Sequence, residues 1–192
     1  IHFGMSGTLH LVKKNKKNTN TNLSFYSEKN LPKKHNHVEI IFDKFRLIYN
    51  DPRRFGFIIL LLSNQKFLNF FKKLGLEPLD IGFNYTYLKN KIFYRKKNIK
   101  NILLDQSIVS GLGNIYVNEI LNYSKVNPKK FGFKLLPNEI KLIIRYSKVV
   151  IKKAIIKGGS SIRNFKSSKG QKGSYQNEFR VYDRNEKECI NK

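Results

Sequence analysis

The hydrophobic pattern of this chain changes its period near residue 63. Before that point, the segments "IHFGMSGTLHLV", "HVEIIF", "FRLIYN" and "RFGFIILLL" have the composition and alternation of β-strands. From residue 64 the apolar residues recur at helical spacing, first in "NQKFLNFFKKLG", which Gly75 closes. A strand region followed by a helical region is typical of the α+β class. We therefore expect an antiparallel β domain followed by a helical domain.

The rest of the chain continues the helical pattern and then changes again. Helices are predicted over 85–96 and 98–105, and Pro137 opens a long amphipathic helix that Gly158-Gly159 ends. Its expected apolar stripe consists of Ile140, Ile143, Ile144, Ser147, Ile151, Ala154 and Ile155. The runs "KKNKKNTNTN" and "SSKGQKGS" are predicted to be loops, and "YQNEFRVYDR" is predicted to be a strand.

Length and composition limit the protein class. A chain of 192 residues with 40% hydrophobic residues can form one large or two small domains. The longest apolar run, "FIILLL", is too short for a membrane span, so membrane insertion is not expected. A start at Ile-His-Phe rather than Met suggests a fragment whose true N-terminus is missing, without a signal peptide. The single cysteine, Cys189, excludes an internal disulfide framework and fits a reducing compartment.

The charge favours a polyanionic partner, most simply nucleic acid. The net charge is +25 and the isoelectric point is near 10.1. A competing explanation is that A/T-rich codons account for part of the lysine excess, since Lys, Asn, Ile, Phe and Tyr are all abundant. The scarcer arginines are more informative. Arg53-Arg54 follow an Asp-Pro turn signal, and their planar donors suit phosphates and base edges.

A glycine-rich turn precedes one of the expected helices. Gly111 and Gly113 flank a turn that ends at Asn114, where the helical pattern Ile115, Glu119, Ile120 begins. Such a turn presents backbone N–H groups and the positive end of a helix dipole to an anion such as phosphate. An ordinary helix–helix turn with Asn114 as its N-cap explains the same residues.

Six motifs in order resemble the bacterial formamidopyrimidine-DNA glycosylase family, the MutM or Fpg group. They are "IHFGMSGTLHL", "KHNHVEI", "DPRRFGF", "LGLEPL", "LLDQSIVSGLGNIYVNEIL" and "GGSSIRNF...GSYQNEFRVYDR". The resemblance implies an N-terminal antiparallel β-sandwich domain, a helix-two-turns-helix DNA-binding domain and the start of a zinc-finger β-hairpin. The implied boundaries are 1–63 for the β domain, 64–80 for a linker, 81–165 for the helical domain and 166–192 for a damage-covering loop and the start of the hairpin.

The resemblance also implies roles for individual residues. Met5, Arg53 and Phe55 match the three side chains that enter the space left when a damaged base is flipped out. Alone, Met5 and Phe55 would be interpreted as core residues and Arg53 as a solvated charge. Contacts to the DNA backbone are implied for His35, Arg53, Lys96, Asn114, His2 and, more weakly, Lys100.

The family's catalytic groups have no match in residues 1–192. The relatives use an N-terminal proline amine as nucleophile, an adjacent glutamate and an early lysine, which we expect to lie upstream of Ile1. The family's structural zinc has two Cys-x-x-Cys pairs. Cys189 matches the first ligand, but "CINK" has Lys192 where the second cysteine belongs, so zinc retention is doubtful in this sequence. Gln171 and Asp183 are further departures from the family pattern, where lysine and "YGR" are usual.

The resemblance therefore implies a bifunctional DNA glycosylase and lyase of base-excision repair that removes 8-oxoguanine and formamidopyrimidines from duplex DNA. It implies a monomer in the bacterial cytoplasm, associated with the nucleoid. Two alternatives remain: an endonuclease VIII-like pyrimidine glycosylase, which "DPRRFGF" disfavours, and a non-catalytic DNA-binding remnant.

Overall fold

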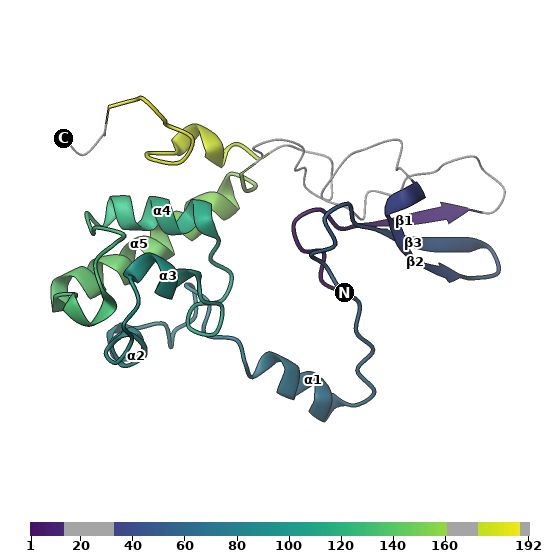
Figure 1. The fold of residues 1–192 in the computed structure, drawn as a ribbon, viewed down its shortest axis with the longest axis horizontal. Helices are drawn as coiled ribbons and strands as arrows, with labels where there is room; N and C mark the ends of the chain where they lie inside the picture. Colours follow the sequence, from purple (N-terminus) through teal and green to yellow (C-terminus); the bar gives the residue numbers. More distant parts are fainter. Residues whose placement is uncertain (14–32, 161–172, 189–192) are drawn as a thin grey trace. The chain divides into compact units, whose positions relative to one another are not determined.

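The computed structural model describes residues 1–13, 33–160 and 173–188, which group into two compact units (Figure 1). Unit 1 comprises Ile1–Leu61 and Lys157–Gln176, and unit 2 comprises Leu62–Ile156 and Asn177–Lys192. The α+β class predicted from the sequence is confirmed, since the described strands lie in unit 1 and the described α-helices in unit 2.

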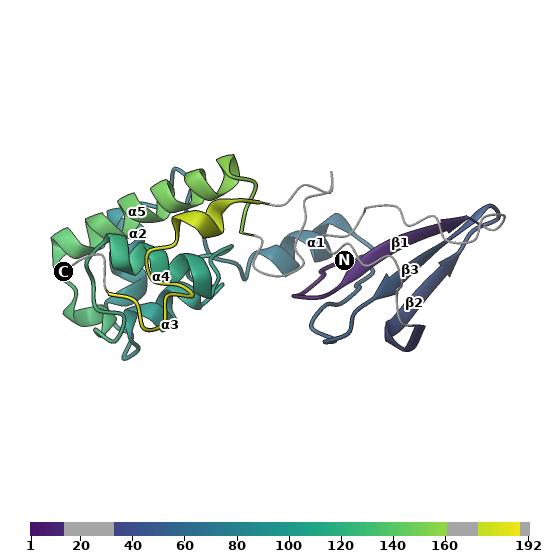
Figure 2. The same cartoon turned by 90° about the horizontal axis from the view of Figure 1, so that it is seen from above.

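A three-stranded antiparallel sheet is the framework of unit 1 (Figure 2). Its strands are β1 (Thr8–Lys13), β2 (Asn36–Ile41) and β3 (Phe45–Asn50), in the order β1-β3-β2. The strands predicted from "HVEIIF" and "FRLIYN" are confirmed. They form a hairpin that turns at Asp43-Lys44, and the rings of Phe42 and Phe45 stack at its end with centroids 4.5 Å apart. The central strand β3 ends in the buried residues Tyr49 and Asn50, which lead directly into the segment 51–57.

The entry into β2 differs from expectation. Strand spacing would put His35 and His37 of the motif "KHNHVEI" on one face of a single strand, but only His37 lies in a strand. His35 is the last residue of the 3-10 helix η1 (Lys33–His35), whereas His37 lies where the register of β2 against β3 shifts between Asn36 and Val38. The backbone N–H of Asp51 donates to the carbonyl of His35 at 3.0 Å, which ties this irregular entry to the end of β3.

The predicted strand over residues 54–62 is also wrong in the described structure. Only an isolated bridge is present, in which Phe57 and His2 exchange two backbone hydrogen bonds of 2.9 Å. At the start of this segment Arg54 has a left-handed backbone with φ of 58°, and the N–H of Gly56 donates to the Asp51 carboxylate, so the first residues belong to a turn.

Unit 2 is helical, and its predicted helices are confirmed within a few residues. The α-helices are α1 (Asn64–Phe71), α2 (Tyr85–Ile92), α3 (Ile99–Leu104), α4 (Asn114–Tyr123) and α5 (Pro137–Ile156), with the 3-10 helix η2 (Gly132–Lys134) before α5. Ser63, Asn84 and Asn98 cap the first three helices through side-chain oxygens that accept a backbone N–H, which explains where these helices begin. The fully buried side chains at the centre of this unit include Phe83, Leu88, Ile99, Ile102, Leu103, Ile120 and Ile143.

The long helix α5 starts at Pro137 as predicted, but its buried stripe differs toward the C-terminal end. The buried residues are Ile140, Ile143, Ser147, Val150 and Ala154, whereas Ile155 is 64% exposed. The buried residues are separated alternately by three and four positions, which keeps them on one face of the helix. The expected series Ser147, Ile151, Ile155 advances by four residues at each step and therefore turns away from that face. Val150 therefore takes the place that had been expected for Ile151.

Residues 175–184 do not form the expected strand. Tyr175–Glu178 form the 3-10 helix η3, and the residues up to Glu188 are turns and bends. The predicted loops at "KKNKKNTNTN" and in "SSKGQKGS" fall wholly or mainly outside the described residues, as do Gln171 and Cys189. No helix in the described ranges is long and apolar enough to cross a membrane.

His10 of β1 is a buried histidine that cannot gain a proton without cost. Its side chain is 3% exposed, and its Nε2 lies 2.7 Å from Thr8 Oγ1. Thr8 Oγ1 in turn donates to the carbonyl of Asn50, so it accepts from His10. His10 Nδ1 has no hydrogen-bond partner among the described residues, and burial lowers the pKa of His10 below its ordinary value of 6.5.

Unit 1 should lose stability as the pH falls below about 6.5. The unfolded chain takes up a proton at His10 there while the folded chain does not, so the loss continues until the lower folded pKa is reached, with a slope of at most about 1.4 kcal/mol per pH unit. Hydrogen-exchange protection of the β1 and β3 amides between pH 7.5 and 5 measures it. His10→Gln should remove this slope, whereas the control His37→Gln should keep it. An equal slope in both variants would contradict the assignment.

Candidate nucleic-acid interface

The segment after β3 is organised by the carboxylate of Asp51. This side chain is fully buried and accepts four hydrogen bonds. The donors are Ser6 Oγ at 2.5 Å, Gly56 N at 2.9 Å, Tyr49 Oη at 3.1 Å and Arg53 N at 3.3 Å. Asp51 therefore fixes both ends of the turn 51–56 and joins it to the segment around Ser6.

These contacts move two pKa values in opposite directions. Burial raises the pKa of Asp51, but the hydrogen bonds from Ser6, Gly56, Tyr49 and Arg53 together lower it by more. The pKa of Asp51 therefore lies below its ordinary value. Burial, followed by the hydrogen bond to Asp51 and its negative charge, raises the pKa of Tyr49 to about 12. The phenol thus remains a donor and the carboxylate an acceptor at neutral pH.

Two glycines allow the segments 2–6 and 53–57 to approach each other closely. A Cβ on Gly4, whose φ is 59°, would lie 2.6 Å from the carbonyl carbon of Phe55. A Cβ on Gly56 would lie 1.9 Å from the Tyr49 hydroxyl oxygen and 2.5 Å from the carbonyl oxygen of His2. Side chains at either position would separate the two segments.

This packing leaves the three residues predicted to replace a flipped base at the surface and close together. Met5 is 59% exposed and Phe55 is 60% exposed. Arg53 Nη1 lies 3.8 Å from Met5 Sδ. The Asp51 carboxylate fixes the turn that carries Arg53 and Phe55 and joins it to the segment around Ser6. This arrangement suits the exposed aromatic ring, thioether and guanidinium to enter a stack of bases. The structure thus excludes the interpretation of Met5 and Phe55 as core residues.

Two histidines predicted to contact DNA lie beside this turn. The ring of His2 stacks on that of Phe57, with centroids 5.2 Å apart, and its Nδ1 accepts the N–H of Gly4 at 3.0 Å. His35 is half-buried and supplies the carbonyl that accepts the Asp51 N–H. His37 Nε2 lies 2.8 Å from the carbonyl oxygen of Asp51, so both histidines of "KHNH" are tied to this residue.

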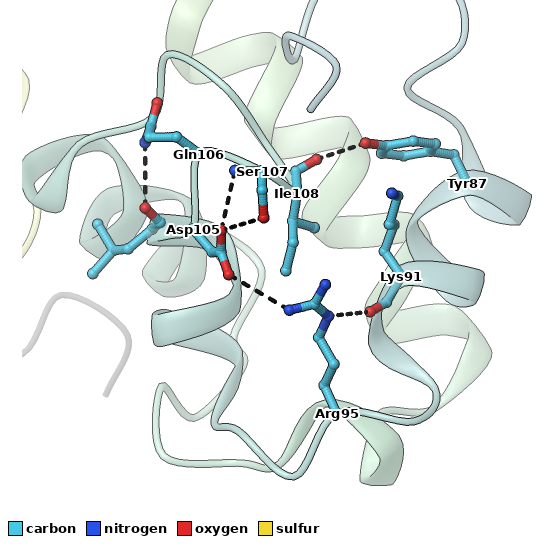
Figure 3. Close-up of polar contacts among 8 residues, drawn as sticks. Tyr87, Lys91, Arg95, Asp105, Gln106, Ser107 and Ile108 are labelled. Carbon is cyan, nitrogen blue, oxygen red and sulfur yellow. Dashed lines mark hydrogen bonds and ion pairs between the residues drawn. The ribbon is translucent and has the colours of Figure 1, made fainter. Parts of the chain in front are cut away.

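In unit 2, the connection from α3 to α4 is held by side chains from α2 and from the connection itself (Figure 3). Asp105 accepts the N–H and the hydroxyl of Ser107 at 3.0 and 2.6 Å, and Arg95 Nη1 lies 3.5 Å from its other oxygen. The Ser107 hydroxyl, together with Arg95 and Lys97, outweighs the effect of burial and lowers the pKa of Asp105. This carboxylate remains charged at neutral pH.

Gln106 closes the glycine turn from inside. Its Nε2 donates to the carbonyl of Leu112 at 2.8 Å, and its Oε1 accepts the N–H of Gly111 at 2.8 Å. The Tyr87 hydroxyl donates to the carbonyl of Ile108 at 2.8 Å, which attaches the start of the turn to α2 (Figure 3). The turn is therefore fixed to its surroundings at both ends.

The first turn of α4 is open to an anion. The N-cap is Gly113, not Asn114, and no side chain in the described ranges caps this helix. Asn114 is the first helical residue and is exposed. The helix N-terminus thus offers backbone N–H groups and the positive end of its dipole, with the Asn114 amide beside them. The alternative of an N-capping Asn114 is wrong.

The two lysines expected at the interface lie near α3. Lys96 is exposed on the connection between α2 and α3, and Lys100 is half-buried in the first turn of α3, where its N–H donates to the carbonyl of Pro128. The structure therefore brings His2, Met5, Arg53 and Phe55 together in unit 1. Lys96, Lys100 and Asn114 belong to unit 2.

A buried glutamate attaches the C-terminal segment to α4. Glu119 is fully buried and accepts the N–H groups of three consecutive residues: Arg180 at 2.8 Å, Val181 at 3.0 Å and Tyr182 at 2.9 Å. The guanidinium of Arg180 also lies over the Tyr123 ring, 4.6 Å from its centroid. A strand at 180–182 would use these N–H groups in a ladder, which explains why the predicted strand is absent.

Sequence reasoning missed three residues that organise the interface: Asp51, Gln106 and Glu119. Asp51 could have been found, because an aspartate before Pro52 is a turn former whose side chain bonds to nearby N–H groups. For Gln106 and Glu119 no local signal existed, since their partners are set by the tertiary fold.

Two family models match the chain. The model described as the formamidopyrimidine-DNA glycosylase N-terminal domain matches residues 1–58, and that described as the H2TH domain of the same enzyme matches residues 74–166. The chain belongs to the formamidopyrimidine-DNA glycosylase family. The resemblance drawn from the six sequence motifs is thereby confirmed.

Curated relatives and solved structures agree with this assignment. The formamidopyrimidine-DNA glycosylase of Rickettsia bellii is 38% identical over 99% of this chain and 65% of the relative, and that of Bartonella tribocorum is 42% identical over 77% and 53%. A mutant Lactococcus lactis FPG bound to Fapy-dG-containing DNA matches 98% of this chain and 65% of that one, with 33% identity and a TM-score of 0.77. The Lactococcus lactis Fpg bound to abasic-site DNA has a TM-score of 0.75, with 33% identity over 97% of this chain and 64% of that one. The chain spans about 65% of the length of the Rickettsia bellii relative.

The described residues contain no complete metal site. Among the described ranges, no group of three or more His, Cys, Asp or Glu side chains could hold a metal ion. The sequence contains one cysteine, Cys189, which lies outside those ranges, whereas a structural zinc site takes four ligands.

Replacing Asp51 with Asn should release the turn 51–56. The amide keeps the shape but replaces one acceptor oxygen with a donor, which opposes the N–H and hydroxyl groups that point at it, at a cost of about 1–3 kcal/mol. Exchange protection of the Arg53 and Gly56 amides should fall together with affinity for duplex DNA. The matched control is Glu39→Gln, which removes an exposed ion pair with Arg46 and should have almost no effect. Unchanged protection in Asp51→Asn would contradict the role given to this carboxylate.

Proposed function

We propose that this chain forms the DNA-binding part of a bifunctional glycosylase and lyase that removes 8-oxoguanine and formamidopyrimidines from duplex DNA in base-excision repair. The observation that carries the proposal is the anchored turn that presents Met5, Arg53 and Phe55 together at the surface. Family membership and the Lactococcus lactis complexes with Fapy-dG and abasic-site DNA support it.

The three exposed side chains would fill the space that a flipped base leaves. Extruding a nucleotide costs a few kcal/mol of stacking and pairing, which inserted side chains partly offset. Phe55 is the apolar wedge, Met5 is the flexible filler and Arg53 hydrogen-bonds the cytosine opposite the lesion. The contact between Arg53 and Met5 orients the guanidinium for this role.

The remaining residues would bind the DNA backbone. Asn114 and the uncapped N-terminus of α4 suit a phosphate, because helix dipole and N–H groups act on the same anion. Lys96 adds a charge that is free to reach the surface, and Lys100, His35 and His2 are further contacts, as is Arg53. The domain boundaries at 63, 80 and 165 are part of the same proposal.

For the whole enzyme we propose a reaction through an imine between a protein amine and the sugar. No residue of this sequence is assigned as that amine. In the family the nucleophile is an N-terminal proline amine, which attacks C1' and leads to β- and δ-elimination, and residues 1–192 contain no match to it. The chain's own contribution is to bind the duplex, insert into it and hold the damaged nucleotide out of the stack.

Cys189 is proposed as the first ligand of the family's structural zinc, although the ligands present here do not complete that site. Because the fit fails, no step of the mechanism depends on zinc. The proposed partner is duplex DNA with oxidised purines or abasic sites, the proposed state is a monomer, and the proposed location is the bacterial cytoplasm at the nucleoid.

Arg53→Ala and Lys96→Ala should differ in kind. Loss of a phosphate contact at Lys96 should weaken all duplexes alike and reduce the slope of log K against log salt by about one unit. Loss of Arg53 should mainly remove the preference for cytosine opposite the lesion, by about 1–3 kcal/mol. Titrations of the complete enzyme with duplexes that differ only in the opposing base distinguish the two. Identical profiles would reduce Arg53 to a phosphate contact.

Residues 1–192 alone should form no covalent adduct with DNA that contains 8-oxoguanine when borohydride is added. Borohydride traps an imine by reducing it, and the chain contains no residue assigned as the amine nucleophile. The complete enzyme, if it begins with Pro-Glu, should be trapped under the same conditions and serves as the positive control. Trapping by residues 1–192 would show that an amine of this chain, from a lysine or from the N-terminus, can act as the nucleophile.

A further inference from the structure

Four aromatic side chains are exposed together on two connections of unit 2. Phe93 and Tyr94 follow α2 and are 53% and 87% exposed, and Phe131 and Phe133 precede α5 and are 43% and 47% exposed. With the lysines beside them, they are termed the aromatic–lysine patch. Exposed rings cost free energy in water, so four in one place on a helical unit with a well-packed core call for a partner.

Backbone hydrogen bonds place the two connections side by side. The N–H of Gly132 donates to the carbonyl of Lys97 at 3.0 Å, and the N–H of Ile99 donates to that of Lys130 at 2.8 Å. Gly132 lies so close to the core that a Cβ there would come within 2.5 Å of Ile102 Cδ1. The patch therefore rests on a fixed base, next to the end of α2.

The rings contact one another in pairs and remain partly exposed, and Lys134 Nζ lies 6.0 Å from the centroid of the Phe133 ring. Phe93 and Tyr94 meet edge to face with centroids 4.8 Å apart, and Phe131 and Phe133 stack with centroids 5.7 Å apart. Because the Tyr94 side chain is 87% exposed, its ring can accept a planar group.

The charge around the rings is positive. The segments "FYRKKN" and "NPKKFGFK" contain no acidic residue. Arg95 and Lys130 are paired with Asp105 and Glu139, at 3.5 and 2.7 Å. Among the described residues, no salt bridge engages the exposed lysines of the two segments, which are Lys96, Lys97, Lys129 and Lys134.

We propose that the aromatic–lysine patch binds single-stranded nucleic acid, with unpaired bases stacked on Tyr94 and the phenylalanine rings and phosphates held by the lysines. Open ring faces interleaved with lysines are the composition of a single-strand platform. In a duplex the faces of the bases are already stacked, so rings that do not intercalate can stack only on unpaired bases. The patch consists of other residues than the Met5–Arg53–Phe55 turn, shares Lys96 with the proposed duplex contacts, and does not depend on lesion chemistry.

The test uses Tyr94→Trp in the full chain. Residues 1–192 contain no tryptophan, so the variant reports on this position alone. An oligothymidylate of about 12 nucleotides, within the usual site sizes of about 4–16, should quench its fluorescence by stacking. The binding constant should fall with salt by about 0.7 units of slope for each phosphate contacted.

Removing the rings should weaken this binding specifically. Phe131→Ala and Phe133→Ala, each combined with Tyr94→Trp, should lower affinity for the oligothymidylate by about fivefold to a hundredfold, the range found when a stacked base loses its aromatic partner. The matched control is Phe67→Ala on α1, an exposed phenylalanine outside the patch, which should leave affinity unchanged.

Three results would overturn the proposal. Inorganic polyphosphate competing as well as the oligonucleotide would mean that the lysines act without base stacking. A blue shift and brightening with vesicles of phosphatidylglycerol, without quenching by oligothymidylate, would assign the patch to a membrane surface. Equal loss in Phe67→Ala and Phe133→Ala would mean that the rings of the patch have no particular role.

Discussion

Backbone N–H groups that leave regular secondary structure need acceptors, and in this chain polar side chains supply them. Asp51 accepts the N–H groups of Arg53 and Gly56, Gln106 accepts that of Gly111, and Glu119 accepts three in a row. Each acceptor fixes a segment that no strand or helix could hold, because an orphaned buried N–H costs as much as a lost hydrogen bond. The turn 51–56, the glycine turn before α4 and the C-terminal segment 180–182 all depend on this arrangement.

Each unit exposes potential binding groups at an irregular turn, but the groups differ in kind. In unit 1 the irregular turn exposes side chains, and two glycines let neighbouring segments touch so that Met5, Arg53 and Phe55 gather at the surface. In unit 2 the turn exposes backbone, because the N-cap Gly113 has no side chain to compete with an anion for the first N–H groups of α4. One unit thus offers groups that can enter a base stack, and the other offers groups suited to phosphate.

The sequence predicted most of the secondary structure, because periodicity and capping residues act locally. Pro137 opens α5 as predicted, and the helix predicted over 98–105 is α3, whose N-cap is Asn98. The predictions failed where distant groups compete for the backbone. "RFGFIILLL" has strand composition, yet Asp51 takes its first N–H groups, and "YQNEFRVYDR" loses its ladder donors to Glu119, which lies 61 residues before Arg180. The candidate site was predictable from motifs, whereas the carboxylates that build it are visible only in the fold.

The pairing of Tyr49 with Asp51 has a consequence for the conditions under which the turn keeps its shape. The phenol would ordinarily ionise at 10.0 and the carboxyl at 3.8. Burial together with the contact to Asp51 raises the pKa of Tyr49, and the hydrogen bonds from Ser6, Gly56, Tyr49 and Arg53 lower that of Asp51 against the effect of burial, so the interval between the two pKa values widens at both ends. Stability from Asp51 is lost only in acid, as pH falls through its lowered pKa, and stability from Tyr49 is lost only above pH 10, as the pH rises toward about 12. Between these limits neither group changes charge. The turn 51–56 therefore keeps its charge state over the whole range near neutral pH, although His10, a few residues away on β1, leaves the sheet of the same unit sensitive to mild acid.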